Sequence, residues 1–261
     1  MSLENVKTAG RTLDLFEVFA EARGPLSLTE LAQAIESPIS STHALVRTLR
    51  ARGYLYVLEE RKLIYPTRRI LKIAQSMTHE DPLIDLAQAE MRRLLLATNE
   101  TILLGKQQGE HITYLEVLES THSIRYSAEP GDTRPLHSSA IGKATLSVLQ
   151  DDEILALLHK AGLKRITKTT IVDTKALLED IRAGRQHNTF ITRGENVADV
   201  MGIAISLHLG GEAVGIAIAG PMSRVSEKEK EYIALLQTTI SNLNEIEGPS
   251  VRQLPGSRRL R

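Results

Sequence analysis

The first 66 residues carry apolar positions at helical spacing, followed by two short apolar runs. The spacing predicts a first helix over residues 6–22, a short second helix over residues 29–35 and a third helix that starts near residue 40. The two apolar runs around a charged turn predict a β-hairpin over residues 54–65. Helix, short helix, turn, helix and hairpin follow one another in the order of a winged helix-turn-helix.

Local signals mark the ends of these elements. Ser27 and Glu30 have the spacing of a capping box, in which each side chain hydrogen-bonds the backbone N–H of the other residue. Pro38 predicts a turn, because proline disfavours helical geometry in the residue before it. Gly53 is expected to follow the last turn of the third helix.

Beyond Pro66 the pattern changes to helices and short strands. A connecting helix is expected over residues 69–77, and Gly210-Gly211 predicts a tight hairpin turn. The other helices are expected over residues 83–98, 140–149, 151–160, 174–187 and 226–246. The strands are expected over residues 101–106, 111–118, 122–128, 200–208 and 212–219. We therefore predict an α+β protein with two domains, divided near residue 80.

The charges are unevenly spread, although the chain as a whole has 32 basic and 32 acidic residues. Residues 38–72 contain eight basic and two acidic residues, a net charge of +6, so the rest of the chain carries −6. The basic segment covers the predicted third helix and hairpin. A local excess of this kind indicates contact with DNA, whereas the neutral sum argues against indiscriminate coating of nucleic acid.

The outward side of the predicted third helix carries small hydroxyl side chains, a histidine and an arginine. Such side chains can contact base edges or phosphates, and basic residues at the hairpin tip can reach the DNA backbone. The candidate DNA-binding residues are Thr29, Ser40, Ser41, Thr42, His43, Arg47, Arg61 and Lys62. The alternative is a solvated helix face beside a charged turn, but the order of the elements and the basic segment together favour DNA.

Composition excludes several kinds of chemistry. The chain has no cysteine, which excludes disulfides, thiolate metal sites and a cysteine nucleophile. Its eight histidines are scattered without an HxH or HxxxH pair, so we predict no metal site and no cofactor. No signal peptide and no run of about 18 apolar residues occurs, so we expect a cytoplasmic protein without membrane contact.

Residues 135–144 (PLHSSAIGKA) invite comparison with a phosphate-binding loop. That motif needs glycine five residues before Gly142, where His137 stands, and serine or threonine after Lys143, where Ala144 stands. The segment instead predicts a loop that leads into a helix, whose free backbone N–H groups can hold a small anion. A helix start that packs on a sheet is the alternative. The serines of this segment lack a GxSxG elbow, so no acyl-transfer site is predicted.

From about residue 5 to residue 246 the chain resembles the IclR family of bacterial transcriptional regulators. The most specific part of the resemblance is the segment that ends in Gly142-Lys143-Ala144. The segments that carry it are residues 28–32 (LTELA), 40–49 (SSTHALVRTL) with 52–54 (RGY), 135–144 (PLHSSAIGKA), 192–195 (TRGE) with 202–204 (GIA), and 220–224 (GPMSR).

The resemblance implies a particular domain organisation. A winged helix-turn-helix DNA-binding domain is expected over residues 1–66, a linker helix over 67–80 and an effector-binding domain of GAF/profilin-like α/β fold over 81–247. The composition of residues 248–261 predicts a disordered basic tail. The implied partners are double-stranded palindromic operator DNA, a small-molecule effector such as an organic acid, and further copies of the chain in a homodimer or dimer of dimers.

The resemblance also places the effector pocket between the sheet and the helix at the Gly-Lys-Ala segment, with backbone N–H groups near Ala140 and Ile141 as anion donors. The chain has six tyrosines, three phenylalanines and no tryptophan, and Tyr126 and Tyr114 are the nearest candidates to stack on a ligand. The candidate effector-binding residues are Tyr126, Ser139, Ala140, Ile141, Thr192, Gly202, Ala217 and Ala219.

The chain departs from relatives at three positions in the predicted DNA-binding and effector-binding regions. Several relatives carry an arginine in the recognition helix where this chain has Ala44, and Arg47 can substitute for it one turn later. Relatives that bind keto acids carry serines where this chain has Ala217 and Ala219. Each missing hydroxyl partner is worth about 0.5–1.5 kcal/mol. We therefore expect an acid that is larger or more apolar than glyoxylate or pyruvate.

Two alternatives to a ligand-responsive regulator are kept open. The first is a DNA-binding regulator that assembles through protein contacts and has no small-molecule ligand. The second is an enzyme acting on a small acid, which no nucleophile–base pair in the sequence supports. We expect a regulator and not an enzyme.

Overall fold

The computed structural model describes residues 6–77 and 81–246 and divides the chain into two compact units, Met1–Glu80 and Asp81–Arg261. The first unit holds the predicted winged helix-turn-helix and linker helix, and the second holds the predicted effector domain. The predicted basic tail, residues 248–261, lies outside the described residues.

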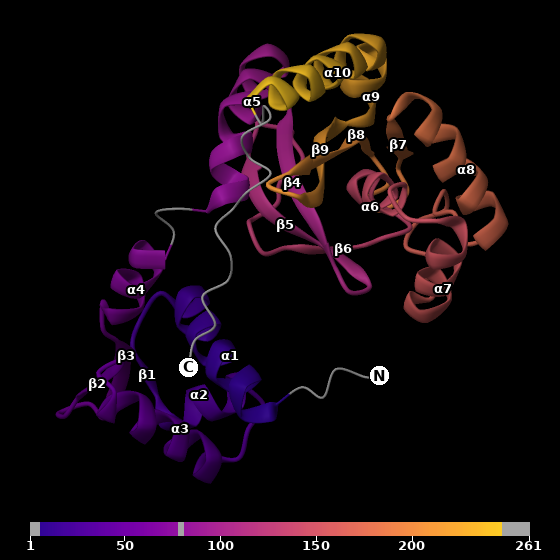
Figure 1. Cartoon of the computed structure of the whole chain (residues 1–261). Coiled ribbons are helices and arrows are strands. Elements are labelled where there is room, and N and C mark those ends of the chain that lie inside the picture. The colour runs from indigo at the N-terminus through magenta and orange to yellow at the C-terminus, as the bar shows by residue number, and fades with distance from the viewer. Residues whose placement is uncertain (1–5, 78–80, 247–261) are drawn as a thin grey trace, which may run out of the picture. The chain divides into compact units, whose positions relative to one another are not determined.

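The first domain consists of helices packed on a small antiparallel sheet (Figure 1). Its elements are α1 (Lys7–Ala22), β1 (Leu26–Ser27), α2 (Leu28–Ala34), α3 (Ile39–Ala51), β2 (Leu55–Leu58), β3 (Leu63–Pro66) and α4 (Arg69–Met77). The strand order is β1-β3-β2, so the short strand before α2 joins the β2–β3 hairpin. Leu15, Leu31 and Leu55 are buried in a core that helices and strands share.

The predicted ends of α2 and α3 are confirmed. Ser27 Oγ accepts a hydrogen bond from Glu30 N at 3.3 Å, and Ser27 N donates to Glu30 Oε2 at 2.7 Å. The second of these bonds lowers the pKa of the Glu30 carboxyl. Gly53 follows α3 with a φ of +76°, a left-handed conformation that glycine adopts without steric cost. The chain therefore turns sharply at this point, from α3 into the hairpin.

The second domain is built on a six-stranded antiparallel sheet with the order β6-β5-β4-β9-β8-β7. The strands are β4 (Thr101–Gln108), β5 (His111–Leu118), β6 (Thr133–Pro135), β7 (Phe190–Arg193), β8 (Val200–Leu209) and β9 (Glu212–Pro221). The helices are α5 (Pro82–Thr98), α6 (Ala140–Leu146), α7 (Asp151–Ala161), α8 (Thr174–His187), α9 (Met222–Glu227) and α10 (Glu229–Ile246). The predicted Gly210-Gly211 turn joins β8 to β9, and both glycines have positive φ.

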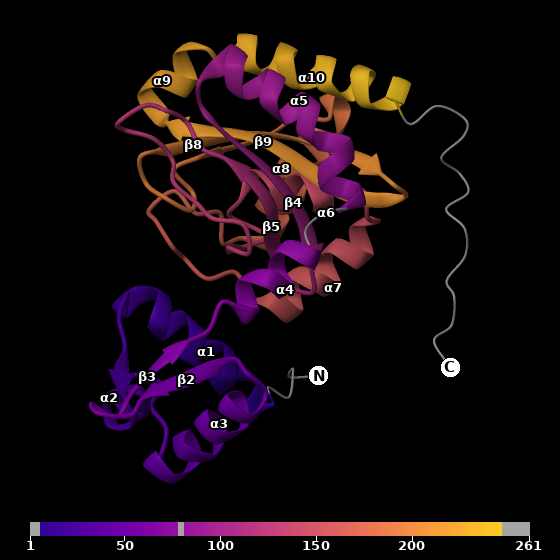
Figure 2. The same cartoon turned by 90° about the vertical axis from the view of Figure 1, so that its left-hand side faces the viewer.

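Helices cover both faces of this sheet. α5 and α10 lie side by side on one face, whereas α6, α7 and α8 lie on the other (Figure 1 and Figure 2). Residues of β8 and β9 alternate between the faces. Isoleucines such as Ile203 and Ile218 belong to the core beneath α5 and α10, whereas Ala204, Ala217 and Ala219 belong to the core beneath α6. The small side chains leave room between the sheet and α6.

Glycines allow α6 to approach the sheet closely at Ile141. A Cβ atom at Gly215 would lie 2.7 Å from Ile141 Cγ2, and one at Gly105 would lie 3.1 Å from the same atom. Side chains at these two positions would therefore crowd the Ile141 side chain. The two glycines leave room for Ile141 against β4 and β9.

Some predicted elements are wrong. Residues 122–128 form no strand, because distant side chains bind their backbone: Arg224 donates to Ile124 O and Thr101 to Tyr126 O. The helix predicted over residues 226–246 is divided into α9 and α10 at Lys228. The short strands β1, β6 and β7 are absent from the prediction.

Candidate functional site

A basic groove lies between α3 and the β2–β3 hairpin in the first domain. Its lining consists of Leu28, His43, Val46, Arg47, Arg50, Ala51, Val57, Lys62 and Ile64. Three predicted DNA-binding residues, His43, Arg47 and Lys62, are therefore brought together in one groove. The predicted residues outside this lining are Thr29, Ser40 and Arg61, which are exposed, and Ser41, which is half-buried. That these residues bind DNA stays a prediction.

Thr42 does not belong to this surface, which corrects its assignment as a DNA contact. The residue is fully buried, and its hydroxyl donates to Pro38 O at 3.2 Å. Thr42, Val46 and Leu49 are spaced so that they share one side of α3, and all three are buried. Thr42 therefore helps to pack α3 within the domain.

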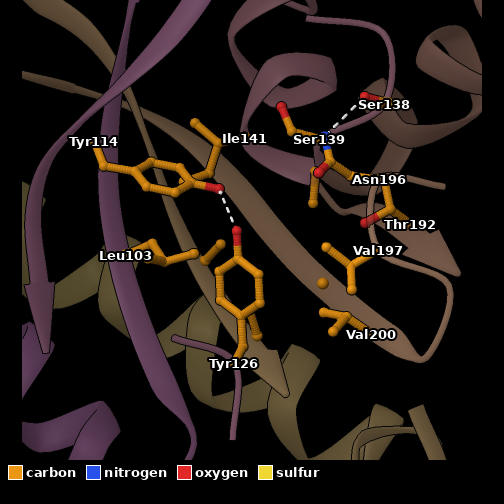
Figure 3. Close-up of a pocket in the computed structure, with 14 residues that line it drawn as sticks. Leu103, Tyr114, Tyr126, Ser138, Ser139, Ile141, Thr192, Asn196, Val197 and Val200 are labelled. Atoms are coloured by element: carbon orange, nitrogen blue, oxygen red, sulfur yellow. Dashed lines mark hydrogen bonds between the residues drawn. The ribbon is translucent and has the colours of Figure 1, made fainter. Parts of the chain in front are cut away.

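A cavity in the second domain lies between α6 and the alanine-bearing face of the sheet (Figure 3). All of the predicted effector-binding residues line it, namely Tyr126, Ser139, Ala140, Ile141, Thr192, Gly202, Ala217 and Ala219. The cavity has a volume of about 40 Å³. The structure thus brings residues from widely separated segments to one cavity, while their binding of an effector stays a prediction.

Tyr114, which the sequence also suggested as a stacking residue, lines the cavity as well. The lining residues that were not predicted are Leu103, Ser138, Asn196, Val197 and Val200. Two of them could have been predicted from their neighbours in the sequence. Ser138 precedes the predicted residue Ser139, and Asn196 directly follows the TRGE segment. Leu103 reaches the cavity through strand pairing, because it lies opposite the lining residue Ala217 in the register of β4 and β9.

Ser139 begins α6 as its N-cap. Its Oγ accepts from Gly142 N and donates to Pro135 O, both at 3.0 Å, so this hydroxyl is used within the protein. The N–H groups of Ala140 and Ile141 lie in the first turn, where the helix itself offers no acceptor. That these two N–H groups bind an anion stays a prediction.

A buried ion cluster holds the loop after β7 against α6. Lys143 is fully buried, and its Nζ lies 2.8 Å from Glu195 Oε1 and 2.7 Å from Asp180 Oδ2. Burial raises the pKa of the Glu195 carboxyl, although Lys143 acts in the opposite direction. Hydroxyl groups that hydrogen-bond the backbone oxygens of the same loop come from Thr167, Thr169 and Thr170. These bonds fix the loop that carries Asn196 into the cavity.

His137 is buried beside the start of α6. Its Nε2 lies 2.9 Å from Lys164 O, and because a carbonyl oxygen only accepts, Nε2 carries the proton. Burial lowers the pKa of the imidazole, which favours the neutral ring. His137 therefore ties the segment before α6 to the segment after α7.

The 14 residues that line the cavity carry hydroxyl, amide and apolar groups, with no carboxylate, imidazole or amine among them. Such a lining can bind a small molecule through hydrogen bonds and apolar contact. Within residues 6–77 and 81–246 we find no group of three or more potential metal ligands, and no helix there is long and apolar enough to cross a bilayer.

A winged helix-turn-helix domain followed by a domain with a small-molecule cavity defines the class of transcriptional regulators with an effector domain. Residues 8–59 match the IclR helix-turn-helix domain, and residues 75–244 match the bacterial transcriptional regulator IclR C-terminal domain. The chain therefore belongs to the IclR family. Its relatives are regulators and not enzymes, which confirms the prediction of a regulator.

Individual relatives agree with this assignment. The HTH-type transcriptional repressor AllR of Escherichia coli (strain K12) is 26% identical over 219 residues, 83% of this chain and 81% of AllR. The crystal structure of Thermotoga maritima IclR has a TM-score of 0.76 at 20% identity, covering 94% of this chain and 100% of that one. An IclR homologue from Microbacterium hydrocarbonoxydans, complexed with 4-hydroxybenzoate, has a TM-score of 0.72 at 18% identity, covering 91% and 98%. The predicted α+β fold class, with its winged helix-turn-helix and α/β domain, is confirmed.

Proposed function

We propose that this regulator binds a palindromic operator as a dimer or tetramer, and that a small organic acid in the cavity of the second domain changes its affinity for DNA. The observation that carries the proposal is the cavity itself, whose lining combines the first residues of α6 with small apolar and hydroxyl side chains from the rest of the domain. The homologue from Microbacterium hydrocarbonoxydans supports an acid, because its ligand, 4-hydroxybenzoate, is one.

The acid's carboxylate is assigned to the start of α6. The N–H groups of Ala140 and Ile141 point along the helix axis, and the partial positive charge of a helix start favours an anion. Ala217 and Ala219 offer apolar surface to the rest of the ligand. This division favours an acid with a larger apolar body than glyoxylate or pyruvate.

The DNA is assigned to the groove between α3 and the hairpin. In this arrangement α3 enters the major groove, where Arg47 and His43 contact bases or phosphates, while Arg61 and Lys62 approach the DNA backbone. Two copies of α3 reach successive major grooves when they lie about 34–36 Å apart, and a dimer with two-fold symmetry matches a palindromic operator. The acid alters DNA binding if it prefers one spacing of the two copies over another.

We expect Arg47→Ala to weaken binding to the DNA upstream of the protein's own gene by about 10-fold or more, since one well-placed arginine contact contributes about 1–3 kcal/mol. Fluorescence anisotropy with labelled DNA at several salt concentrations measures the Kd and its salt dependence. If Arg47 binds a phosphate, the slope of log K against log salt concentration should also become shallower by about 1 for each phosphate that the variant no longer binds.

The matched control is Lys175→Ala, which removes an exposed positive charge from the second domain and should leave the Kd unchanged. Equal losses of affinity in the two variants would contradict the assignment of DNA to α3. The same conclusion would follow if the unaltered protein bound this DNA no better than an unrelated sequence.

A further inference from the structure

Two tyrosine hydroxyl groups meet in the cavity. Tyr114 belongs to β5 and Tyr126 to the irregular segment before β6, and they are 4% and 9% exposed. Their Oη atoms lie 3.4 Å apart, and Figure 3 shows the two hydroxyls pointing toward each other inside the cavity. Arg134 Nε donates to Tyr126 Oη at 3.1 Å, and the Arg134 guanidinium lies 5.3 Å from the centre of the Tyr114 ring.

The two tyrosines have more O–H donors than the cluster has acceptors. Tyrosine hydroxyls carry one proton each at neutral pH, and burial raises the pKa of Tyr114 further. The bond between the two hydroxyls uses one of the two protons, whichever residue donates. Arg134 only donates, so it accepts neither proton. Neither hydroxyl has another partner among the described residues, so one phenolic O–H has no acceptor within this part of the protein.

We propose that this unused O–H recognises a second hydrogen-bond acceptor on the effector, such as a carbonyl oxygen, in addition to the carboxylate. The inference rests on the proposed function, because it takes the effector to be an organic acid bound in this cavity. It narrows the effector to oxo acids and similarly substituted acids, in preference to acids whose remaining part is pure hydrocarbon.

The arrangement of polar groups supports a ligand with two polar ends. Figure 3 shows the tyrosine hydroxyls on one side of the cavity and Ser138, Asn196 and Thr192 on the other. The lining also has apolar members, and Figure 3 shows Val197 and Val200 next to Asn196 and Thr192. A ligand that spans this space therefore meets hydrogen-bonding groups at both ends.

The unused donor also supplies specificity. A hydrocarbon acid would cover the O–H without offering it an acceptor, and a buried donor left unpaired costs free energy. An oxo acid of the same size would restore the hydrogen bond. The positive charge of Arg134 beside Tyr126 Oη strengthens the O–H of this cluster as a donor. We expect a preference for the oxo acid of about 10-fold or more.

The test compares acids that differ only by one carbonyl group: pentanoate with 4-oxopentanoate, and 4-methylbenzoate with 4-formylbenzoate. Isothermal titration of the full chain gives the Kd of each. The carbonyl-bearing member of a pair should bind at least about 10-fold more tightly. The variant with both Tyr114→Phe and Tyr126→Phe should lose this preference, whereas each single variant should retain most of it, because one phenolic proton remains.

The outcomes separate this inference from the proposed function. Binding of both members of each pair with Kd values within about twofold would overturn the inference and leave acid sensing intact. Failure of all four acids to bind would contradict acid sensing and the inference together. The comparison of acids on the unaltered chain needs no variant, so it decides the matter even if the double variant fails to fold.

Discussion

Replacing Lys143 with methionine is expected to destabilise the second domain by about 3–5 kcal/mol, the cost of removing one partner from a buried ion pair. Lys143 is fully buried, and its ammonium group is the cation that faces the buried carboxylate of Glu195. Methionine would fill a similar volume but would leave that carboxylate without its counterion. Urea denaturation followed by circular dichroism measures the loss of stability.

The loss of stability should depend on pH in a definite direction. The pKa of Glu195 is already raised by burial, and removal of Lys143 would raise it further. A carboxyl whose pKa is raised in the folded state favours folding while it is protonated, and this contribution disappears as the pH rises through the folded pKa. The deficit of the Lys143→Met protein should therefore be largest at neutral pH and shrink as the pH falls toward 5.

Lys160→Met is the matched control, because the Lys160–Glu110 ion pair is 2.7 Å long but partly exposed. Exposed pairs contribute about 0–1 kcal/mol, so this variant should remain nearly as stable as the unaltered protein. Similar losses of stability in the two variants, or a loss at Lys143 that does not change between pH 5 and 8, would show that the buried cluster does not hold the loop as described.

The second large effect is expected at Gly142, for a steric reason. A Cβ atom there would lie 2.2 Å from Leu136 O and 2.7 Å from Leu136 Cα, and backbone atoms cannot move aside as a side chain can. We expect Gly142→Ala to cost about 3 kcal/mol or more in the free energy of unfolding. It should also abolish acid binding, because it displaces the start of α6 from the cavity.

Gly202→Ala serves as the control for this substitution, because it lies in the same domain and also lines the cavity. The nearest atoms to its Cβ would be Thr192 Oγ1 at 3.1 Å, a side-chain atom that can shift slightly, and Ala140 Cβ at 3.4 Å, which is an ordinary contact distance. Its cost should be less than half that of Gly142→Ala in the same denaturation experiment. Equal costs would contradict the close packing of α6 on the segment before it.

Elements with strong local signals were predictable from the sequence. Residues 174–187 match α8, which begins after Asp173, whose side chain caps the helix through Ala176 N. The capping box at Ser27 and the turn at Gly53 were predictable for the same reason, since both depend on residues a few positions apart. The family motifs likewise led to the residues that line the cavity.

Features that depend on distant residues were not predictable. The strand predicted over residues 122–128 is absent because its backbone is bound by a distant side chain. Arg224, 100 residues beyond Ile124, donates to Ile124 O, a group that would otherwise be free to pair with a neighbouring strand. The ion pair of Lys143 with Glu195 joins residues 52 positions apart, and no local pattern indicates that partner. Thr42 was misassigned because its polar side chain suggested exposure, whereas its hydroxyl finds an acceptor within its own helix turn.

Coupling between the cavity and DNA binding is tested most directly by measuring the Kd for upstream DNA with and without the acid that most stabilises the protein in a thermal-shift screen. We expect that acid to change the Kd by about 5-fold or more, the usual lower range of coupling between two sites. Ala217→Leu, which fills the cavity, should bind DNA as the unaltered protein does but lose the response to the acid. No change in Kd with any stabilising acid, or an undiminished response in the Ala217→Leu protein, would contradict the cavity as the sensing site.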